Sequence, residues 1–499
     1  LSRVECYGPI LAIVLCAFVG CGAYEVPPHE AAYGRDVTDQ LFDSAIGMLN
    51  SPGESSGDGT LVQVANRLNQ WLAAQPKPAD WHPDAMVGSL GDELRNSPLM
   101  QSLDELRFGT EDALALQQAV WLRDAARSAV GRETEPLARA RLLFDWTVRQ
   151  IELTLASDDT LPRLPWQIVL SGRGSADERA WVFSLLARQQ GLDVVLLTAD
   201  ADAGRQDEPT GVLAALVYDG ELWLFDPQLG LAIPGADGKG FATLKQAADE
   251  PQVLDQLAIE GEPPYRYARS QMQQMVAMLP VAPHELALRM QLIESRLAGP
   301  QRLSLSVSPS AVKSRIEKID HIGQVQLWHQ AIARWRPNSA DTRSRLQAEL
   351  APFRALPDAP LWKGRVLHIC GRLGGDKGAI AYYQRARPAE EDLQVAIDQN
   401  RFEGDLLAQT RAGKAAATYW LGIASMERGN FDAAIDYFRE RVLADDPNGG
   451  WAAGARFNLG CTYEVLDRRN EAIAEFKKTR GPQRRGNLLR ARQLEAADR

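Results

Sequence analysis

Cysteine and histidine are scarce in this chain, and their positions matter more than their number. The 499 residues include five cysteines and six histidines. No cysteine lies between residues 22 and 369, and no histidine lies between residues 85 and 283. Five unevenly placed cysteines cannot form a disulfide framework. The long central span therefore has neither a thiol to attack a substrate nor an imidazole to accept its proton.

The histidines stand singly and give no metal-site pattern. None has the paired spacing, or the neighbouring pair of cysteines, that a zinc site requires. The Gly-rich turn at Gly371, Gly374 and Gly375 lacks the GKS or GKT ending of a phosphate-binding loop. We therefore predict neither a bound metal nor a cofactor. The histidines are His29, His82, His284, His321, His329 and His368.

Positive charge is also in short supply. Lys and Arg number 55 against 65 Asp and Glu, which gives a formal net charge of -10. Phosphate binding depends on an excess of basic residues on one face, so we expect no nucleic-acid partner. The tail after Glu475 is a local exception, and it fits either a solvated or frayed helix end or a contact for an acidic partner. Its basic residues are Lys477, Lys478, Arg480, Arg484, Arg485, Arg490 and Arg492.

Long apolar runs are rare as well. The run from Ile10 to Val19 has about half the length that a membrane-spanning helix needs, so it is typical of the apolar part of a signal peptide. It ends in Phe18-Val19-Gly20-Cys21, which resembles a bacterial lipobox. That resemblance implies that Cys21 is diacylated and becomes the mature N-terminus. Phe18 stands where the motif usually has Leu, and Glu5 dilutes the positive charge of the preceding segment.

An ordinary signal peptide, cleaved near Gly22 or Ala23, is the alternative, in which Cys21 is discarded. Both interpretations predict an exported protein. The lipobox further predicts a membrane-anchored protein of the cell envelope, on the periplasmic side or at the surface, with residues 1–22 as signal peptide and lipobox.

The mature chain is predicted to be α+β. Residues 23–132 have the spacing of amphipathic helices, and residues 133–285 combine helices with β-rich segments. In the second region Ser175 is placed as the N-cap of an apolar helix. The dipeptide Asp219-Gly220 between two apolar runs predicts a β-hairpin.

The remaining chain divides into a mixed connecting region, a helical region and a basic tail, at 286–360, 361–480 and 481–499. Within the connecting region we expect a strand from Leu303 to Val307 and a helix from Ile322 to Trp335.

The order of elements from Leu137 to about Pro234 resembles the transglutaminase-like domain, a branch of the papain-like fold. This order is a helix, a Gly-rich turn, a buried helix, a strand, a hairpin and Asp-Pro. In that family a cysteine opens the buried helix, a histidine begins the first strand of the hairpin, and an aspartate follows the second strand. The thiolate attacks a carbonyl, the histidine withdraws its proton, and the aspartate orients the imidazole.

Transferred to this chain, the resemblance puts the cysteine position at Ala176, the histidine position near Leu213 and the aspartate at Asp226. The methyl group of Ala176 cannot attack a carbonyl and the isobutyl group of Leu213 cannot accept a proton, so these positions supply neither the nucleophile nor the base of acyl transfer. Ser175 is the nearest substitute nucleophile, but without a general base it stays a protonated alcohol. We interpret Asp226 as a loop residue that caps backbone amides beside Pro227.

A self-similar pattern occurs near the C-terminus. Leu421-Gly422, Ala434 and Phe438 are followed 38 residues later by Leu459-Gly460, Ala472 and Phe476. The set resembles the tetratricopeptide repeat, in which Leu-Gly packs the first helix closely, Ala lets the second helix approach and Phe fills the space between repeats. A degenerate earlier unit is placed at Trp362 to Ala386, with Ala379 and Tyr383 as its landmarks. Such a stack implies a concave surface for a peptide or protein partner, and internal support of the central domain is the alternative.

Together these observations predict a non-catalytic cell-envelope lipoprotein that acts as a protein- or peptide-binding scaffold. The overall order also looks like lipoproteins of the planctomycete type with a transglutaminase-like core, a resemblance that implies no substrate. Two alternatives stay open. One is a hydrolase of the transglutaminase-like, cysteine-protease clan with an unrecognised nucleophile, and the other is a structural envelope component that assembles with copies of itself.

Overall fold

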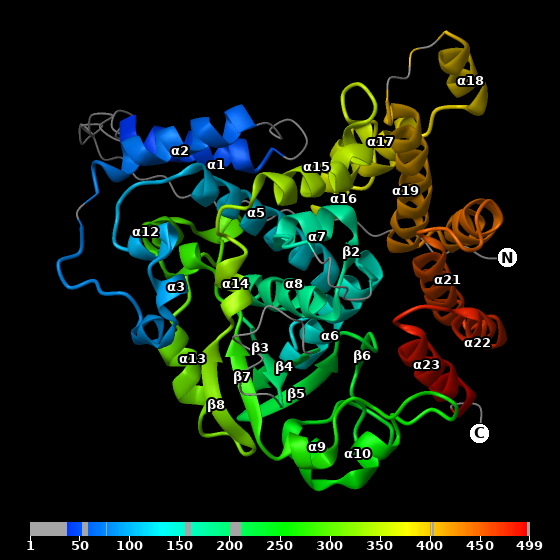
Figure 1. The fold of residues 1–499 in the computed structure, drawn as a ribbon, viewed down its shortest axis with the longest axis horizontal. Helices are drawn as coiled ribbons and strands as arrows, with labels where there is room; N and C mark the ends of the chain where they lie inside the picture. Colours follow the sequence, from blue (N-terminus) through cyan, green and yellow to red (C-terminus); the bar gives the residue numbers. More distant parts are fainter. Residues whose placement is uncertain are drawn as a thin grey trace, which may run out of the picture.

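The computed structural model describes residues 37–51, 58–75, 77–154, 161–199, 211–399, 401 and 404–496. The predicted signal peptide and Cys21 lie outside these residues. The fold combines helices with a mixed β-sheet and continues into a C-terminal helical region (Figure 1). Within the described residues, no helix is both long and apolar enough to pass through a membrane.

The chain before the sheet is helical, as its spacing predicts. α1 and α2 pair with each other and pack on α5, and the rings of Phe42 and Trp71 lie 4.8 Å apart in the core between them. The helices are α1 (Val37–Leu49), α2 (Asp58–Leu72), the 3-10 helix η1 (Ala85–Ser89), α3 (Asp92–Arg95), α4 (Pro98–Gln101), α5 (Thr110–Val130) and α6 (Pro136–Gln150).

The central sheet has six strands in the order β6-β5-β4-β3-β7-β8. Neighbours are antiparallel except for β7 and β8, which pair in parallel. The predicted hairpin is β4 and β5, and its turn residues Asp219 and Gly220 have φ values of 53° and 74°, as a two-residue turn of the primed type needs. The strands are β3 (Asp193–Thr198), β4 (Leu213–Tyr218), β5 (Glu221–Asp226), β6 (Leu231–Ala232), β7 (Met275–Leu279) and β8 (Ile322–Leu327).

The two faces of the sheet belong to different cores, because side chains alternate along each strand. α8 (Ala176–Gln189) covers one face, where Ala214 and Phe225 are buried. The opposite face, with Leu213 and Leu224, packs on α9 (Leu244–Asp249) and α10 (Pro251–Asp255). Smaller elements of this region are β1 (Glu152–Leu153), α7 (Pro165–Ser171), β2 (Arg173–Gly174) and α11 (Arg269–Met272).

The connecting region departs from the prediction at two places. Residues Leu303 to Val307 form no strand, because Leu303 and Leu305 are buried in the core of the N-terminal helices and the segment has no partner strand among the described residues. The helix expected from Ile322 is also wrong, since Ile322–Leu327 is β8 and only α14 (His329–Ala333) follows it. Pairing with the edge of β7 outweighs the local pattern there. The other elements are η2 (Pro283–Leu286), α12 (Leu288–Arg296), η3 (Gly299–Gln301), α13 (Pro309–Ile316) and α15 (Ala340–Arg354).

Three helical hairpins of the C-terminal region share one packing device. In each, a glycine of the first helix lies directly against an aromatic ring of the second. The pairs are Gly364 with Tyr383, Gly422 with Phe438 and Gly460 with Phe476, and a Cβ on the glycine would come within 2.8, 2.5 and 2.6 Å of the ring. The similarity at 38 residues in the sequence is therefore a similarity of packing, and the earlier unit has it too.

The basic tail is largely helical in the described residues. Its helix, α23, packs beside α22. The elements of the C-terminal region are α16 (Pro360–Ile369), α17 (Ala379–Arg385), α18 (Glu390–Asp398), α19 (Leu406–Glu427), α20 (Phe431–Ile435), the π-helix η4 (Asp436–Leu443), α21 (Ala452–Val465), α22 (Arg469–Lys478) and α23 (Arg484–Ala496).

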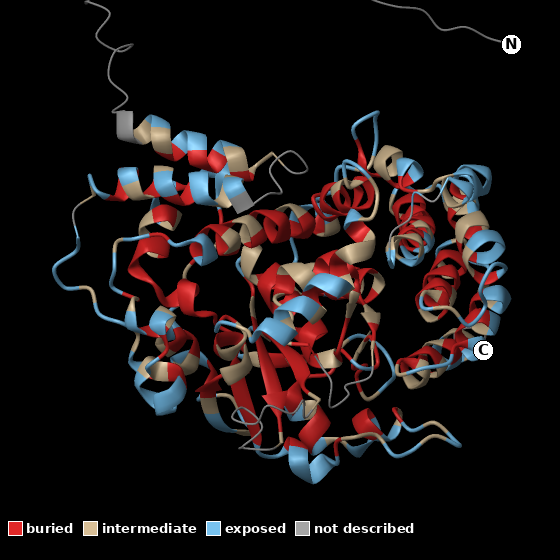
Figure 2. Cartoon of the chain, turned by 45° about the horizontal axis from the view of Figure 1, so that its top comes forward, coloured by how far each residue is buried: buried red, intermediate tan, exposed pale blue. Residues whose placement is uncertain are grey.

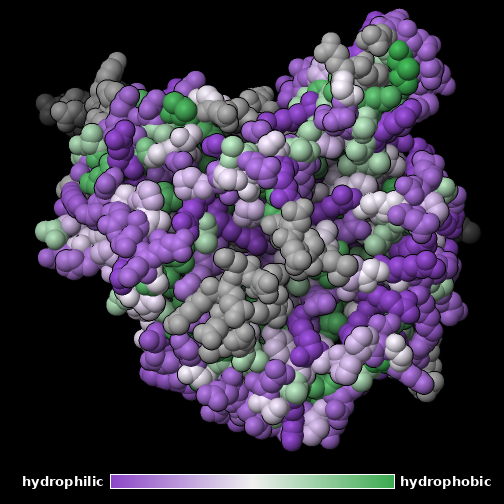
Figure 3. All heavy atoms as spheres, in the orientation of Figure 1, coloured by the Kyte–Doolittle hydropathy of each residue, from purple (hydrophilic) through white to green (hydrophobic). Residues whose placement is uncertain are grey.

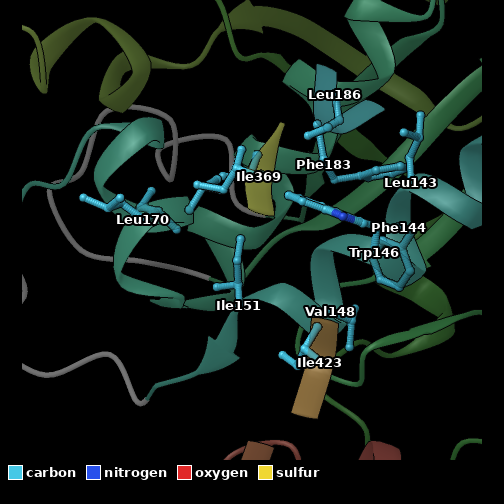
Figure 4. Close-up of a cluster of buried hydrophobic side chains, with 14 of the residues drawn as sticks. Leu143, Phe144, Trp146, Val148, Ile151, Leu170, Phe183, Leu186, Ile369 and Ile423 are labelled. Atoms are coloured by element: carbon cyan, nitrogen blue, oxygen red, sulfur yellow. The ribbon is translucent and has the colours of Figure 1, made fainter. Parts of the chain in front are cut away.

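The hairpins pack on the central part of the molecule through one continuous core. Ile369 of α16 and Ile423 of α19 lie among side chains of α6 and α8 (Figure 4). The outer faces of the hairpins are exposed and their inner faces are buried (Figure 2). The guanidinium of Arg173 lies 4.2 Å from the ring centre of Trp451 at the same junction. The inner face of the hairpins is therefore occupied within the chain.

Candidate functional site

The ends of three elements meet at one corner of the sheet, where the sequence places its triad-like positions. α8 and β4 begin there, and β5 ends there. Asp177 Oδ1 accepts a hydrogen bond from the Val212 amide at 3.0 Å. Arg266 Nη2 donates to the Val212 carbonyl at 2.9 Å and to Asp226 Oδ1 at 3.0 Å. These bonds join the first turn of the helix to the two strands.

The first turn of α8 is closed by its own hydrogen bonds. Ser175 Oγ accepts from the Glu178 amide at 3.2 Å, and Glu178 Oε2 accepts from the Ser175 amide at 3.0 Å. Glu178 is fully buried and also accepts from Arg334 at 2.6 Å. The N-cap prediction for Ser175 is confirmed. Ala176, at the position of the family's cysteine, offers a half-buried methyl group.

Leu213 points away from α8. It is buried on the opposite face of the sheet, whereas its neighbours Val212 and Ala214 belong to the core on the α8 side. Alternation along the strand therefore makes Val212, one residue earlier, the side chain that faces the helix. Val212 is as unable to accept a proton as Leu213.

Asp226 is fully buried and has hydrogen-bond partners on both carboxylate oxygens. Oδ1 accepts from the amides of Gln228 and Leu229 at 2.8 and 3.0 Å, so the predicted capping of backbone amides is confirmed. The same oxygen accepts from Arg266, and Oδ2 accepts from the Tyr265 hydroxyl at 2.8 Å. The carboxylate thus holds the segment at Tyr265 against the end of β5.

The charges at this corner compensate one another. Burial would lower the pKa of Arg266, but the Asp226 carboxylate holds that pKa above its ordinary value. Burial, and then the Asp226 carboxylate, raise the pKa of Tyr265 well above its ordinary value, so the phenol stays protonated. Burial also raises the pKa of Asp177, against the opposing bond from the Val212 amide. The corner therefore holds an ion pair, a protonated phenol and the Asp177 carboxyl, and its hydrogen bonds join α8 to the ends of β4 and β5.

Sequence reasoning missed Tyr265 and Arg266. They follow the short segment Pro263-Pro264, and no local pattern indicates that they meet the end of a strand some forty residues earlier. The one available signal was Asp226 itself, because a buried carboxylate requires a cation or several donors.

The described cysteines and histidines lie elsewhere. Burial raises the pKa of the Cys461 thiol to about 11 and also raises the pKa of Cys370, so neither is a thiolate at neutral pH. His284 is buried against Trp335, and burial lowers its pKa to about 3. In the part of the chain that the structure describes, no group of three or more His, Cys, Asp and Glu side chains could hold a metal.

A second buried polar cluster lies where the hairpins meet the central part, and it too was missed. His368 of α16 lies 2.9 Å from the Tyr383 hydroxyl and 3.0 Å from Glu427 of α19. Glu427 accepts from Gln150 of α6 at 2.7 Å, and Gln150 accepts from Arg365 at 2.7 Å. The His368 side chain is fully enclosed, and burial lowers its pKa. The cluster brings the His368 imidazole into contact with the Glu427 carboxylate. Because His368 is enclosed, we interpret the cluster as a structural contact between α16, α19 and α6.

No protein-family model matches this chain, and no curated protein or solved structure matches it either.

Proposed function

We propose that this protein is a non-catalytic scaffold of the cell envelope, anchored to the membrane through Cys21, that binds a protein or peptide. Its central part is a degenerate transglutaminase-like domain, and its C-terminal hairpins are tetratricopeptide-like repeats. The packing of α8 on an antiparallel sheet, with the β4–β5 hairpin ending in Asp226-Pro227, supports the first assignment. The recurring contact between glycine and an aromatic ring supports the second.

The buried ion pair of Asp226 and Arg266 is the observation that carries the proposal. In the family's chemistry the aspartate orients an imidazole, which activates a thiol. Here the aspartate is held by an arginine, a tyrosine and two amides instead. Ala176 and Val212 occupy the adjoining positions. Acyl transfer would need a nucleophile and a general base at this corner, whereas its two carboxyl groups are Asp226, which is paired with Arg266, and Asp177, which is bonded to the Val212 amide.

The intrachain packing of the hairpins narrows where a partner binds. Because their inner faces are buried on the central part, a partner has the outer faces and the edges of the hairpins. This favours a scaffold whose central domain and hairpins form one supporting body.

An acyl-transfer assay tests the absence of catalysis. Purified protein is incubated with a glutamine-containing protein substrate and a fluorescent primary amine, and separately with fluorogenic peptide amides. We expect no turnover above that of Asp226→Asn. Turnover that Asp226→Asn abolishes, but that Asp237→Asn in an exposed turn leaves intact, would overturn the proposal in favour of the hydrolase.

The anchor is tested separately by changing the lipidated residue. The wild-type protein, expressed in bacteria, should partition into detergent-extracted membranes, and Cys21→Ser should move to the aqueous fraction. Equal partitioning of the two would leave an ordinary signal peptide as the explanation of the N-terminal run.

A further inference from the structure

A basic cleft of about 740 Å³ lies at the edge of the last hairpin. Its walls are the loop before α21 and the turn that joins α22 to α23. Hydrophilic residues gather over this edge of the molecule (Figure 3). The cleft is lined by Arg456, Lys477, Lys478, Arg480 and Arg484, and no carboxylate of the described residues lines it. Five cations thus converge in a protein whose formal net charge is -10.

Neighbouring carboxylates neutralise these cations only in part. Glu475 lies behind the cleft, 2.7 Å from Lys478 and 3.6 Å from Arg456. Lys477 pairs with Glu495, and Arg484 pairs with Glu262 at 2.8 Å. Three carboxylates therefore serve five cations, and the surplus faces the cleft.

Arg480 supplies much of that surplus. Its side chain is exposed, and among the described residues it has no hydrogen-bond or ion-pair partner. The cleft adjoins a second cavity of about 270 Å³, which shares Gly481 and Arg484 with it. That second cavity is lined by Arg485, but also by Asp226 and Glu262, so it holds charges of both signs. The excess of cations is therefore concentrated in the first cavity.

The shape and composition of the cleft favour one class of ligand. No aromatic side chain from the described part of the chain lines it, so these residues offer no platform on which the bases of a nucleic acid could stack. It is concave, whereas a membrane surface is flat and is met by a projecting basic patch. Its floor includes Ala452 and Ala453 at the start of α21, which suits the narrow backbone of an extended chain. Its volume is that of a site for a ligand with several groups rather than for a single ion.

We infer that this cleft binds an acidic peptide segment, whose Asp or Glu carboxylates pair with Arg480 and its cationic neighbours. The inference rests on the proposed function and names the kind of partner that the scaffold takes. It also explains the charge of the tail, because a local excess of cations in an acidic protein attracts a carboxylate-rich segment to one place and repels it elsewhere.

The test measures binding of a fluorescein-labelled oligoglutamate of about eight residues, which spans roughly 25 Å when extended. Fluorescence anisotropy is recorded for the wild type, for Arg480→Glu and for Lys318→Glu. Lys318 is exposed, follows α13 and also has no partner among the described residues. In Figure 1, α13 lies on the opposite side of the molecule from α22 and α23. Both substitutions change the net charge equally, so their difference isolates the position. An oligoglutamine of the same length controls for backbone binding.

We expect saturable binding of oligoglutamate with one peptide per chain, and none of oligoglutamine. Arg480→Glu should raise the Kd by about tenfold or more, whereas Lys318→Glu should leave it nearly unchanged. Raising the ionic strength from about 0.05 M to about 0.5 M should weaken binding strongly, because the cleft is open to solvent. The neutral double variant Lys477→Gln with Arg480→Gln should show the same loss without introducing repulsion.

Three results would overturn the inference. They are a lack of saturable binding by oligoglutamate, equal affinities of Arg480→Glu and the wild type, and binding to phosphatidylglycerol vesicles without binding to the peptide. The acyl-transfer assay separates this failure from that of the proposed function. If the protein neither binds the peptide nor shows turnover, only the assignment of an acidic peptide to the cleft fails. If the protein shows turnover, the scaffold assignment fails, whether or not the peptide binds.

Discussion

Two arginine-containing corners of this molecule use the same side chain in opposite ways. At the end of β5, Arg266 Nη2 donates to the Asp226 carboxylate and to the Val212 carbonyl, and Nη1 donates to Gln228. At the turn between α22 and α23, Arg480 is exposed and has no partner among the described residues. A buried charge must be compensated, since a partner's removal costs about 3–5 kcal/mol, whereas an exposed charge needs only water. Burial therefore decides whether an arginine stabilises this fold or stays available to a ligand.

Breaking the buried pair should have the largest effect. Asp226→Ala leaves Arg266, whose side chain is only 22% exposed, without its carboxylate, so we expect the free energy of unfolding to fall by about 3 kcal/mol, the lower end of the range for a buried pair. Urea denaturation followed by tryptophan fluorescence measures the loss. The double variant Asp226→Ala with Arg266→Met should recover much of it, because no uncompensated charge remains. A single-variant loss no larger than that of an exposed substitution would contradict the comparison.

Closing the space at a hairpin should be the next largest effect, and it extends the comparison from charge to packing. Gly460→Ala places a methyl group where the Phe476 ring lies, so we expect a loss of about 1–3 kcal/mol in the free energy of unfolding. Gly47→Ala is the matched control, because Gly47 lies in α1 with no atom near its added Cβ. That variant should be neutral or more stable by up to about 1 kcal/mol. Equal effects of both substitutions would mean that the ring contact does not matter.

Acidification should weaken the fold through a buried group that has no counter-charge. His284 has a pKa of about 3 in the folded chain, below its ordinary value of 6.5, because of burial and the nearby Arg289 and Arg188. Its contribution to stability is complete above pH 6.5 and declines as the pH falls toward 3, because the unfolded chain binds the proton first. At pH 5 the loss is about 2 kcal/mol.

The control for this pH effect is a variant with no titrating ring. Denaturation of the wild type and of His284→Phe is compared at pH 7.5 and pH 5. On acidification the free energy of unfolding of the wild type should fall by about 2 kcal/mol relative to that of His284→Phe. A difference that stays constant between the two pH values would show that His284 titrates as it does in water.

Changing the exposed arginine should have the smallest effect on stability. Arg480→Glu removes no ion pair among the described residues, so the free energy of unfolding should change by at most about 0.5 kcal/mol. The same urea denaturation measures it. If Arg480→Glu lowered the free energy of unfolding as much as Asp226→Ala does, Arg480 would also stabilise the fold, and the contrast between the two arginines would be wrong.

The sequence predicted this molecule best where the determining contacts are local. Asp219-Gly220 forms the expected turn, since its backbone conformation needs only those two residues. Ser175 caps α8 through the amide of Glu178, three residues away. In the hairpins, Gly422 and Gly460 of the recurring Leu-Gly pairs lie against the recurring Phe438 and Phe476, and both partners of each contact lie within one short unit.

Prediction failed where the partner is distant in sequence. The segment Ile322–Leu327 has a mixed pattern, and only the edge of β7 makes it a strand. Which face of the sheet Leu213 occupies changes if the alignment shifts by one residue, and a resemblance in the order of elements does not fix the alignment that closely. Arg266 and Glu427 were missed because no local sequence pattern indicates that Arg266 contacts Asp226 or that Glu427 contacts His368.

By itself the sequence determined what the central part lacks, the β4–β5 turn, the cap of α8 and the recurrence of Leu-Gly, Ala and Phe near the C-terminus. Only the tertiary structure decided which charges are compensated and which remain available. The reason is physical: the cost of a charge depends on burial and on the distance to its partner, and both arise when segments far apart in the chain come together. No pattern in the sequence distinguishes Asp226 from Arg480, yet Asp226 is fully buried at the sheet corner and Arg480 is exposed in an open cleft.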